Sequence, residues 1–410
     1  MRLSFTNLVL ALPALIHAQI TISTAPGYAD QAWFKLSDET TTARPLAEWD
    51  LAFEINGGFS AGVLVNTAKG MRCYQSPFTV ADWNVVDTAG MAAGWPVLHN
   101  SDTAWGIGAL GHGISGEYDL GWGQYNMITH VVMGDSIYVL QLADGSWNKL
   151  RIDALAGGTY TFTYAGLDGS NTHTGSLDKA DHPGVDFCYW SMTTHAAIDR
   201  EPAASDWDLL FTKYVTDIGM WYGVTGVLQN KNVQVLQVNG LPPEEAAYTF
   251  DQPLATGINT IGYDWKYYDM GASAYVIDDS LTYFVKDVPG NIWKLVFTGF
   301  GGGTTGDITF TKEAVSALGL ANDNEPQHRL LSAFPDPVTD GQVTLVLDGP
   351  SGNGILELFD GGGRSVLQRS IGHGEGLDRS MLDVRTLEPG LYTVQYRQDG
   401  TASAIRLAIQ

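Results

Sequence analysis

Short runs rich in β-branched and aromatic residues recur along this chain, and turn residues separate them. Ser136 to Leu142 is one such run, Ala143 to Ser146 contains an Asp-Gly pair, and Trp147 to Ile152 is the next run. Runs of this kind are typical of strands, and Asp-Gly suits a tight turn because Gly accepts positive φ. The segment is predicted to form a β-hairpin.

A second predicted hairpin repeats the first later in the chain. Leu281 to Val285 and Ile292 to Phe297 are strand-like, and Val288 to Asn291 supplies a Pro-Gly turn between them. Pro presets φ near −65° and Gly accepts the positive φ that such turns require. The two hairpins are predicted to occupy equivalent places in a duplicated structure.

The duplication extends well beyond the hairpins. Trp49-Asp50-Leu51 reappears as Trp207-Asp208-Leu209, and each follows an aromatic pair, Trp33-Phe34 or Tyr189-Trp190. A longer series then keeps one constant offset: Tyr118 with Tyr263, Tyr138 with Tyr283, Gly145 with Gly290, and Lys149 with Lys294. Self-similarity of this length indicates two homologous domains. We predict them at 19–177 and 178–315.

A polar segment and a third domain follow the second copy. Residues 316–330 include Asn322-Asp323-Asn324-Glu325-Pro326 and have no apolar period, so they are predicted to be a linker. Val343 to Leu347 and Gly354 to Phe359 are strand-like, and a last strand ends at Gln410. Short strands at regular spacing predict a small β-sandwich over 331–410.

Composition favours a β-rich fold, and the net charge excludes some classes of binding partner. The chain has 410 residues, enough for several domains, with 48 Gly and 11% aromatic residues, a mixture that favours strands and turns. Its net charge is −23, which repels phosphate backbones and anionic lipid surfaces. Nucleic acid is therefore not an expected partner.

The first 18 residues have the parts of a secretory signal peptide. Arg2 supplies the positive start, Leu8 to Ile16 the apolar run, and Ala18 a small residue before the expected cleavage. That run is shorter than the roughly 20 residues that span a bilayer, and no later stretch is long enough. We expect an exported protein without a transmembrane segment.

Cys73 and Cys188 are the only two cysteines. An exported chain meets an oxidising compartment, where an even pair can form a disulfide. The alternative is two separate buried thiols that behave as small apolar side chains. The sequence leaves both open.

The last domain resembles the type A sorting domain of the Bacteroidetes type IX secretion system. The resemblance rests on Pro335-Asp336-Pro337-Val338, a mid-domain Gly turn, and Leu387-Glu388-Pro389-Gly390-Leu391-Tyr392. It departs from that pattern at Asp336, where the family favours Asn, and at Gln410, where a basic residue is common. The resemblance implies export through the periplasm, the type IX machinery as a partner, and a secreted or cell-surface location.

The duplicated domains resemble the HmuY family of exported all-β proteins, whose best-known members bind haem. The second copy carries the likeness through Trp207 to Tyr214, Ile261 to Lys266, and Tyr283 to Leu295. The resemblance implies an all-β fold of two duplicated antiparallel HmuY-like domains, followed by the small Ig-like sandwich. Shared fold does not carry ligand identity with it.

In the haem-binding members two His hold the iron, so the resemblance requires two suitably placed His in this chain. The second copy has no His between Trp207 and the linker. In the first copy, His112 lies in a Gly-rich loop and His130 in a strand-like run, near Trp105, Trp122 and Tyr125. His112 and His130 are therefore the candidate haem ligands, and the alternative is a turn residue and an ordinary strand histidine.

Other chemistry has no supporting pattern in the sequence. There is no Gly-x-Ser-x-Gly elbow, no phosphate loop of the Gly-x-x-x-x-Gly-Lys form, and no Asp-x-Asp-x-Asp-Gly calcium loop. We therefore expect a non-enzymatic, secreted or surface-attached binding protein that captures haem or another small hydrophobic ligand. The alternative is a structural or adhesive surface module that binds no haem.

Overall fold

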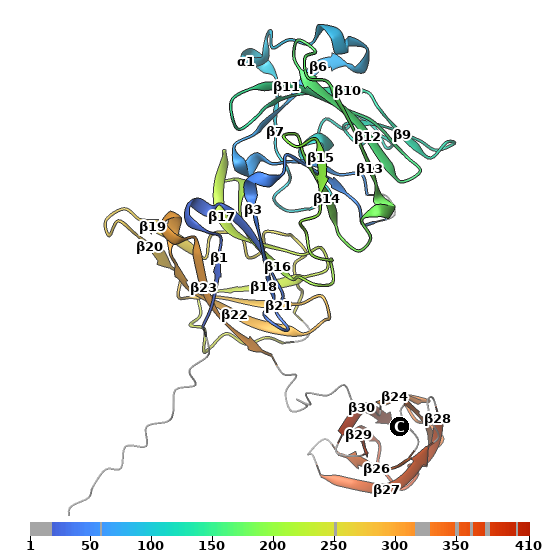
Figure 1. Ribbon diagram of the computed structural model, residues 1–410. Helices are drawn as coiled ribbons and strands as arrows, with labels where there is room; N and C mark the ends of the chain where they lie inside the picture. The colour runs from blue at the N-terminus through green and yellow to red at the C-terminus, as the bar shows by residue number, and fades with distance from the viewer. Residues whose placement is uncertain are drawn as a thin grey trace, which may run out of the picture. The chain divides into compact units, whose positions relative to one another are not determined.

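The computed structural model describes residues 19–57, 60–249, 252–315, 329–348, 352–360, 364–373, 378–398 and 401–410 (Figure 1). The chain separates into two units, 1–315 and 316–410, and the division coincides with the start of the predicted linker. The predicted signal peptide, 1–18, lies outside the described residues. Antiparallel strands dominate both units, so the all-β prediction is confirmed.

The first copy of the duplication is built on two sheets. One runs β13-β12-β11-β10-β6-β7 with the β8–β9 hairpin attached to β11, and the other runs β15-β14-β4-β5. The strands are β4 (Leu51–Glu54), β5 (Val63–Val65), β6 (Arg72–Thr79), β7 (Val97–Leu98), β8 (Gly123–Asn126), β9 (Val131–Gly134), β10 (Ser136–Gln141), β11 (Trp147–Ala156), β12 (Thr159–Gly166), β13 (His173–Asp178), β14 (Phe187–Ser191) and β15 (Ala196–Ile198). Their apolar faces meet in one core that includes Phe53, Trp122, Tyr138 and Phe162.

The second copy repeats this arrangement. One sheet runs β1-β23-β22-β21-β18, another runs β17-β16-β2-β3, and β19 and β20 form the separate hairpin. The strands are β1 (Gln19–Ser23), β2 (Asp30–Phe34), β3 (Thr41–Pro45), β16 (Leu209–Asp217), β17 (Trp221–Gln229), β18 (Gln234–Asn239), β19 (Lys266–Asp269), β20 (Ala274–Ile277), β21 (Leu281–Lys286), β22 (Ile292–Phe300) and β23 (Asp307–Ala314). Phe34, Phe211, Trp265 and Phe310 lie in its core.

Strand pairing does not follow the predicted boundary between 177 and 178. The first strands of the chain belong to the second copy, where β1 pairs with β23 and β2 pairs with β16. The first copy is completed by β13 and β14, which pair with β12 and β4. β1 and β13 form edges of their sheets, whereas β2 and β14 lie inside theirs, and all four pair backbone groups of neighbouring strands that would otherwise be exposed. Figure 1 shows β1, near the start of the chain, beside β23.

Matching buried hydrogen bonds occur in the two copies. Asn66 donates through Nδ2 to Leu46 O (2.8 Å) and Trp49 O (3.0 Å), and Asn230 donates in the same way to Ala204 O and Trp207 O. The two Asn side chains therefore fix the same turn in each copy, because each satisfies two buried carbonyls.

The lysines and tyrosines that match between the copies also donate hydrogen bonds to backbone carbonyls. Lys149 Nζ donates to Trp83 O and Leu167 O, and Lys294 Nζ donates to Pro243 O and Ala246 O. Tyr138 OH donates to backbone carbonyls, as does Tyr283 OH. The residues that keep the constant offset in the sequence thus make contacts of the same kind, from a side chain to backbone carbonyls.

Helical segments are short throughout the first unit. The α-helices are α1 (Met91–Gly94) and α2 (Gly302–Thr305), and the 3-10 segments are η1 (Pro26–Tyr28), η2 (Leu46–Glu48), η3 (Thr67–Lys69), η4 (Val80–Val85), η5 (Ala109–Gly111) and η6 (Lys179–Asp181). Over the described ranges, none of the helices has the length and apolar character needed to cross a membrane.

The second unit is a sandwich of two sheets. One contains β24 (Arg329–Phe334), β25 (Gln342–Asp348) and β28 (Asp378–Asp383), and the other contains β27 (Ser365–His373), β26 (Gly352–Phe359), β29 (Gly390–Gln398) and β30 (Thr401–Ile409). Both sheets contribute to one core, for example through Leu345 and Leu358. β24 begins within the last two residues of the predicted linker.

Asp336, which departs from the sorting-domain pattern, has a defined contact. Its Oδ1 accepts a hydrogen bond from the backbone N–H of Ala408 at 2.9 Å. An Asn side chain carries an equivalent oxygen, so the contact does not depend on the carboxylate. The departure at this position is therefore compatible with the same local structure.

Candidate functional site

A groove of about 530 Å³ opens in the first copy beneath the β8–β9 hairpin. Tyr118 and Leu120 precede the hairpin, His130 lies at its turn, and Leu155 is near the end of β11. The segment before β5 closes another side through Ser60 and Ala61. The complete lining is Gly57, Ser60, Ala61, Glu117, Tyr118, Leu120, Tyr125, His130, Val132, Leu155, Gly157, Gly158 and Lys179.

A second groove, of about 450 Å³, opens in the second copy beneath the β19–β20 hairpin. Aromatic side chains line most of it, and several of them are exposed, such as Tyr267 and Tyr268 on β19 and Tyr275 on β20. The complete lining is Tyr28, Ile218, Tyr222, Gly223, Val224, Thr225, Tyr263, Lys266, Tyr267, Tyr268, Tyr275 and Phe300.

The two grooves occupy equivalent places in the two copies. Tyr263 stands where the first copy has Tyr118, and the same offset relates Tyr275 to His130 and Phe300 to Leu155. Thr225 and Ala61 both lie directly before the Gly that begins the matched Gly-Val-Leu segment. Each copy therefore has a groove at the equivalent position, and different residues line the two grooves.

His130 lies in the first-copy groove and its ring is held in place. The residue has a φ of 57°, and Nδ1 lies 2.7 Å from the hydroxyl of Tyr125. A hydrogen bond of this length orients the imidazole. Nε2 has no hydrogen-bond partner among the described residues, so it is the ring nitrogen that a ligand could reach.

The second candidate haem ligand, His112, does not line this groove. Its Nε2 lies 2.7 Å from the backbone oxygen of His99 and is occupied by that contact. Of the expected aromatic wall, Tyr125 lines the groove, whereas Trp122 is buried and donates to Ala61 O. Trp105 Nε1 donates to Gln229 O at the contact between the copies. The structure thus places only part of the predicted set together.

The remaining first-unit histidines have other surroundings. The rings of His173 and His195 stack with centroids 3.4 Å apart, and His99 stacks on Trp221. His182 lies between Cys188 and Asp199, with contacts of 3.2 Å to each. Within the described ranges, no three His, Cys, Asp or Glu side chains are arranged to hold a metal.

Cys73 and Cys188 are both buried and both free thiols. They lie on β6 and β14, which belong to different sheets, and Cys188 Sγ faces His182 Nε2. The disulfide considered from the sequence is therefore not formed, and the alternative of two buried thiols describes the structure. Burial raises the pKa of Cys188 to about 12, and burial likewise raises that of Cys73.

Each groove contains one lysine. Burial lowers the pKa of Lys266 to about 7, while the nearby charge of Asp264 opposes the shift. Burial also lowers the pKa of Lys179, and Glu54 opposes it. Burial therefore disfavours the ammonium form of both lysines, and the nearby carboxylates partly offset this effect.

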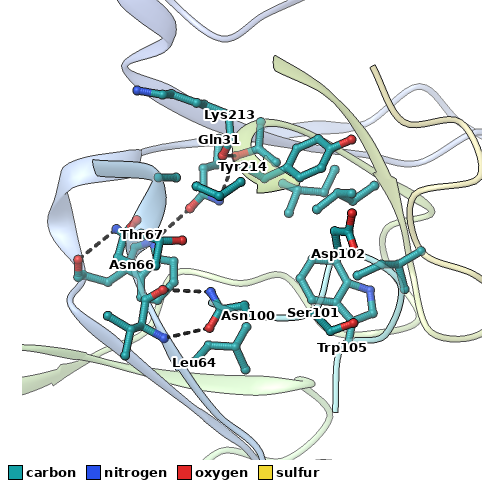
Figure 2. Close-up of a pocket in the computed structure, with 18 of the residues that line it drawn as sticks. Gln31, Leu64, Asn66, Thr67, Asn100, Ser101, Asp102, Trp105, Lys213 and Tyr214 are labelled. Carbon is teal, nitrogen blue, oxygen red and sulfur yellow. Dashed lines mark hydrogen bonds between the residues drawn. The ribbon is translucent and has the colours of Figure 1, made fainter. Parts of the chain in front are cut away.

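A third hollow, of about 70 Å³, lies between the copies and is shown in Figure 2. The polar side chains of this hollow form hydrogen bonds within the protein. Asn100 accepts from the backbone N–H of Val65 and donates to its carbonyl. Gln31 accepts from Trp49 Nε1 and donates to the hydroxyl of Thr212. Asp102 accepts from Thr216, across the contact between the copies. We interpret this hollow as part of that contact, since it is much smaller than a typical ligand pocket.

Sequence reasoning missed the wall of the second-copy groove. Tyr263 was in the matched series with Tyr118, which was the usable signal, but Lys266, Tyr268 and Tyr275 were not identified as a site. Aromatic residues in β proteins are more often core or cross-strand partners, and only the hairpin geometry shows that these lie in a hollow.

No family model matches this chain, and no curated protein does. Among solved structures, apo PinO from Porphyromonas gingivitis covers 73% of this chain and 98% of its own, at 10% identity and a TM-score of 0.28. Dimeric latent PorU from Porphyromonas gingivalis covers 68% and 31%, at 10% identity and 0.17. The BSP domain of a biofilm associated protein covers 66% and 45%, at 11% identity and 0.16. TM-scores this low carry no argument about fold or function.

Proposed function

We propose that this protein is an exported, non-enzymatic binding protein of the cell surface or medium, and that each copy offers its groove to a small apolar ligand. The observation that carries the proposal is the recurrence of a hollow at equivalent positions of both copies. Volumes of about 530 and 450 Å³ lie within the range of small-molecule sites. Exposed aromatic walls favour ligands with flat apolar rings.

Export rests on the sequence features at the two ends of the chain. The predicted signal peptide directs the chain to the periplasm, and the sorting-domain resemblance of 331–410 makes the type IX machinery the proposed partner. The grooves lie wholly in the first unit. In this proposal the second unit serves export and the first unit serves binding.

The proposal is tested by titrating the full-length protein with N-phenyl-1-naphthylamine, a neutral probe that fluoresces in apolar surroundings. Saturable binding at two sites is expected. Phe300→Ala should weaken one site and Tyr125→Ala the other, whereas Trp95→Ala, outside both grooves, serves as the control. Absence of saturable binding, or binding that all three variants leave unchanged, would refute the proposal.

Haem capture is the narrower form of the proposal for the first copy. His130 lines the groove, and Tyr125 occupies its Nδ1, which leaves Nε2 as the nitrogen for a haem iron. A haem titration should therefore give a Soret shift that His130→Ala abolishes. His112→Ala should leave it in place, because His112 lies outside the groove. A shift lost in the His112 variant but kept in the His130 variant would contradict this assignment.

An adhesive role is the second candidate, and exposed apolar side chains at the hairpin tips favour it. Ile128 is 90% exposed and Met270 is 82% exposed, and Met127 is exposed beside Ile128. Exposed apolar side chains gathered on a protruding element are typical of interaction surfaces. Ile128→Ser with Met270→Ser should abolish surface attachment without changing probe binding if adhesion is the main role.

A further inference from the structure

The lysine of the second-copy groove is a buried charge without a counter-ion. Lys266 is 8% exposed, and its Nζ donates to Thr225 O at 2.7 Å and Tyr263 O at 3.2 Å. No carboxylate of the described residues lies within ion-pair distance of it. Buried charges are ordinarily paired, because taking an ion out of water is costly.

Aromatic rings surround this charge. Lys266 Nζ lies 4.1 Å from the ring centroid of Trp265 and 4.4 Å from that of Phe300. Phe300 in turn contacts Tyr275 edge to face, with centroids 4.7 Å apart, and stacks on Tyr28 at 6.1 Å. The groove therefore combines a continuous aromatic wall with one positive charge at its side.

The first-copy groove has the same combination from different residues. Lys179 Nζ donates to the backbone and side-chain oxygens of Ser60, and it lies 5.3 Å from the ring centroid of Tyr160. Ser60 and Thr225 belong to equivalent wall segments, but Lys179 is in η6 and Lys266 begins β19. A protein with a net charge of −23 thus places a lysine in each of these two equivalent grooves.

We propose that the second-copy groove binds a small ligand that carries both a flat apolar ring and an anionic group, with the ring against the tyrosines and the anion at Lys266. This inference rests on the proposed function and adds the charge of the ligand to it. The anion supplies a counter-ion to the buried Lys266, and a hydrogen bond between charged groups is stronger than one between neutral groups. Neutral ring compounds bind through the wall alone.

The proposal predicts a pH dependence with a definite sign. The ammonium form of Lys266 attracts the anion, so affinity for an anionic ligand falls as the pH rises through about 7. No histidine lines this groove. The titratable groups around Lys266 are Asp264 and the tyrosines of the groove, which are Tyr28, Tyr222, Tyr263, Tyr267, Tyr268 and Tyr275. Burial and the neighbouring Tyr275 raise the pKa of Tyr28 to about 12, so it stays neutral over this range.

The experiment compares two probes that share the same ring system on the full-length protein. N-phenyl-1-naphthylamine is neutral, and 8-anilino-1-naphthalenesulfonate carries a sulfonate that stays ionised at every pH used. Lys266→Met should weaken binding of the sulfonate probe to one site by about tenfold, the usual scale for one charge-assisted contact. Binding of the neutral probe should stay within about twofold. Lys266→Arg should restore the sulfonate affinity.

Lys294→Met is the matched control, because Lys294 is also capped by two backbone carbonyls but lies outside the grooves. If Lys266→Met also loses the neutral probe, the pH dependence of the unaltered protein decides: only the sulfonate affinity should fall above about pH 7. Equal behaviour of both probes with pH overturns this inference while leaving the proposed function standing. Failure of both probes to bind the unaltered protein overturns both.

Discussion

Phe34→Ala tests the exchange of strands between the copies. Phe34 is on β2, near the start of the chain, yet it lies in the core of the second copy. Its ring contacts Phe211 edge to face at 6.2 Å and Phe310 at 5.7 Å, and it is fully buried. Removing a buried Phe side chain leaves a cavity and costs about 3–5 kcal/mol. The loss should fall on the second copy.

Trp190→Ala is the matched variant in the first copy. Trp190 pairs with Leu51, as Phe34 pairs with Leu209, and its ring contacts Phe162 at 5.0 Å. Amide hydrogen exchange with peptide-level resolution locates the weakened region in each variant. Phe34→Ala should lower protection first in β16 and β23, and Trp190→Ala first in β4 and β12. The reverse pattern would refute the pairing described for the two copies.

Four further outcomes follow from individual contacts. Both cysteines should react with a thiol reagent only on unfolding and without prior reduction, because both are buried and free; fast labelling of the native protein would contradict this. Burial raises the pKa of Glu201 to about 8, so the folded state binds more protons than the unfolded state from about pH 4.5 to 8, and stability falls as pH rises through that window; denaturation of Glu201→Gln should show a shallower fall. Lys294→Met should lower the free energy of unfolding in urea by about 1–3 kcal/mol, because it leaves two partly buried backbone carbonyls without their donor. Asp336→Asn should leave the melting temperature unchanged and Asp336→Ala should lower it, since only Ala removes the acceptor for Ala408 N–H.

Local turn chemistry made parts of the fold predictable. The hairpin expected over Ser136 to Ile152 is present as β10 and β11, with Gly145 at a φ of 87° in its turn. Its equivalent is present as β21 and β22. Asp-Gly and Pro-Gly fix a hairpin through a few neighbouring residues, so distant parts of the chain are not needed.

The exchange of strands could not be predicted in the same way. An aromatic pair precedes each Trp-Asp-Leu segment, so the sequence pattern places Trp33-Phe34 in the first copy, with the segment that follows it. The structure pairs it instead with Leu209 and Leu210 of the other copy. Both pairings satisfy the local pattern, and only the long-range closure of β1 on β23 distinguishes them.

The candidate site was predictable only in part. His130 does lie in a groove, but residue type alone also selected His112, whose ring is occupied by His99 O. The lysines were overlooked because a lone Lys carries no motif. Burial and the surrounding aromatic rings mark these lysines as part of a site, and the sequence has no local signal for either feature.

Counting the binding sites for the neutral probe on the full-length protein tests the central claim most directly. Fluorescence titration with N-phenyl-1-naphthylamine should reveal two saturable sites, of which Phe300→Ala weakens one and Tyr125→Ala the other. Those variants would then assign one site to each copy. A protein that binds no probe, or binds it at one site that neither variant affects, would contradict the account of two equivalent binding grooves.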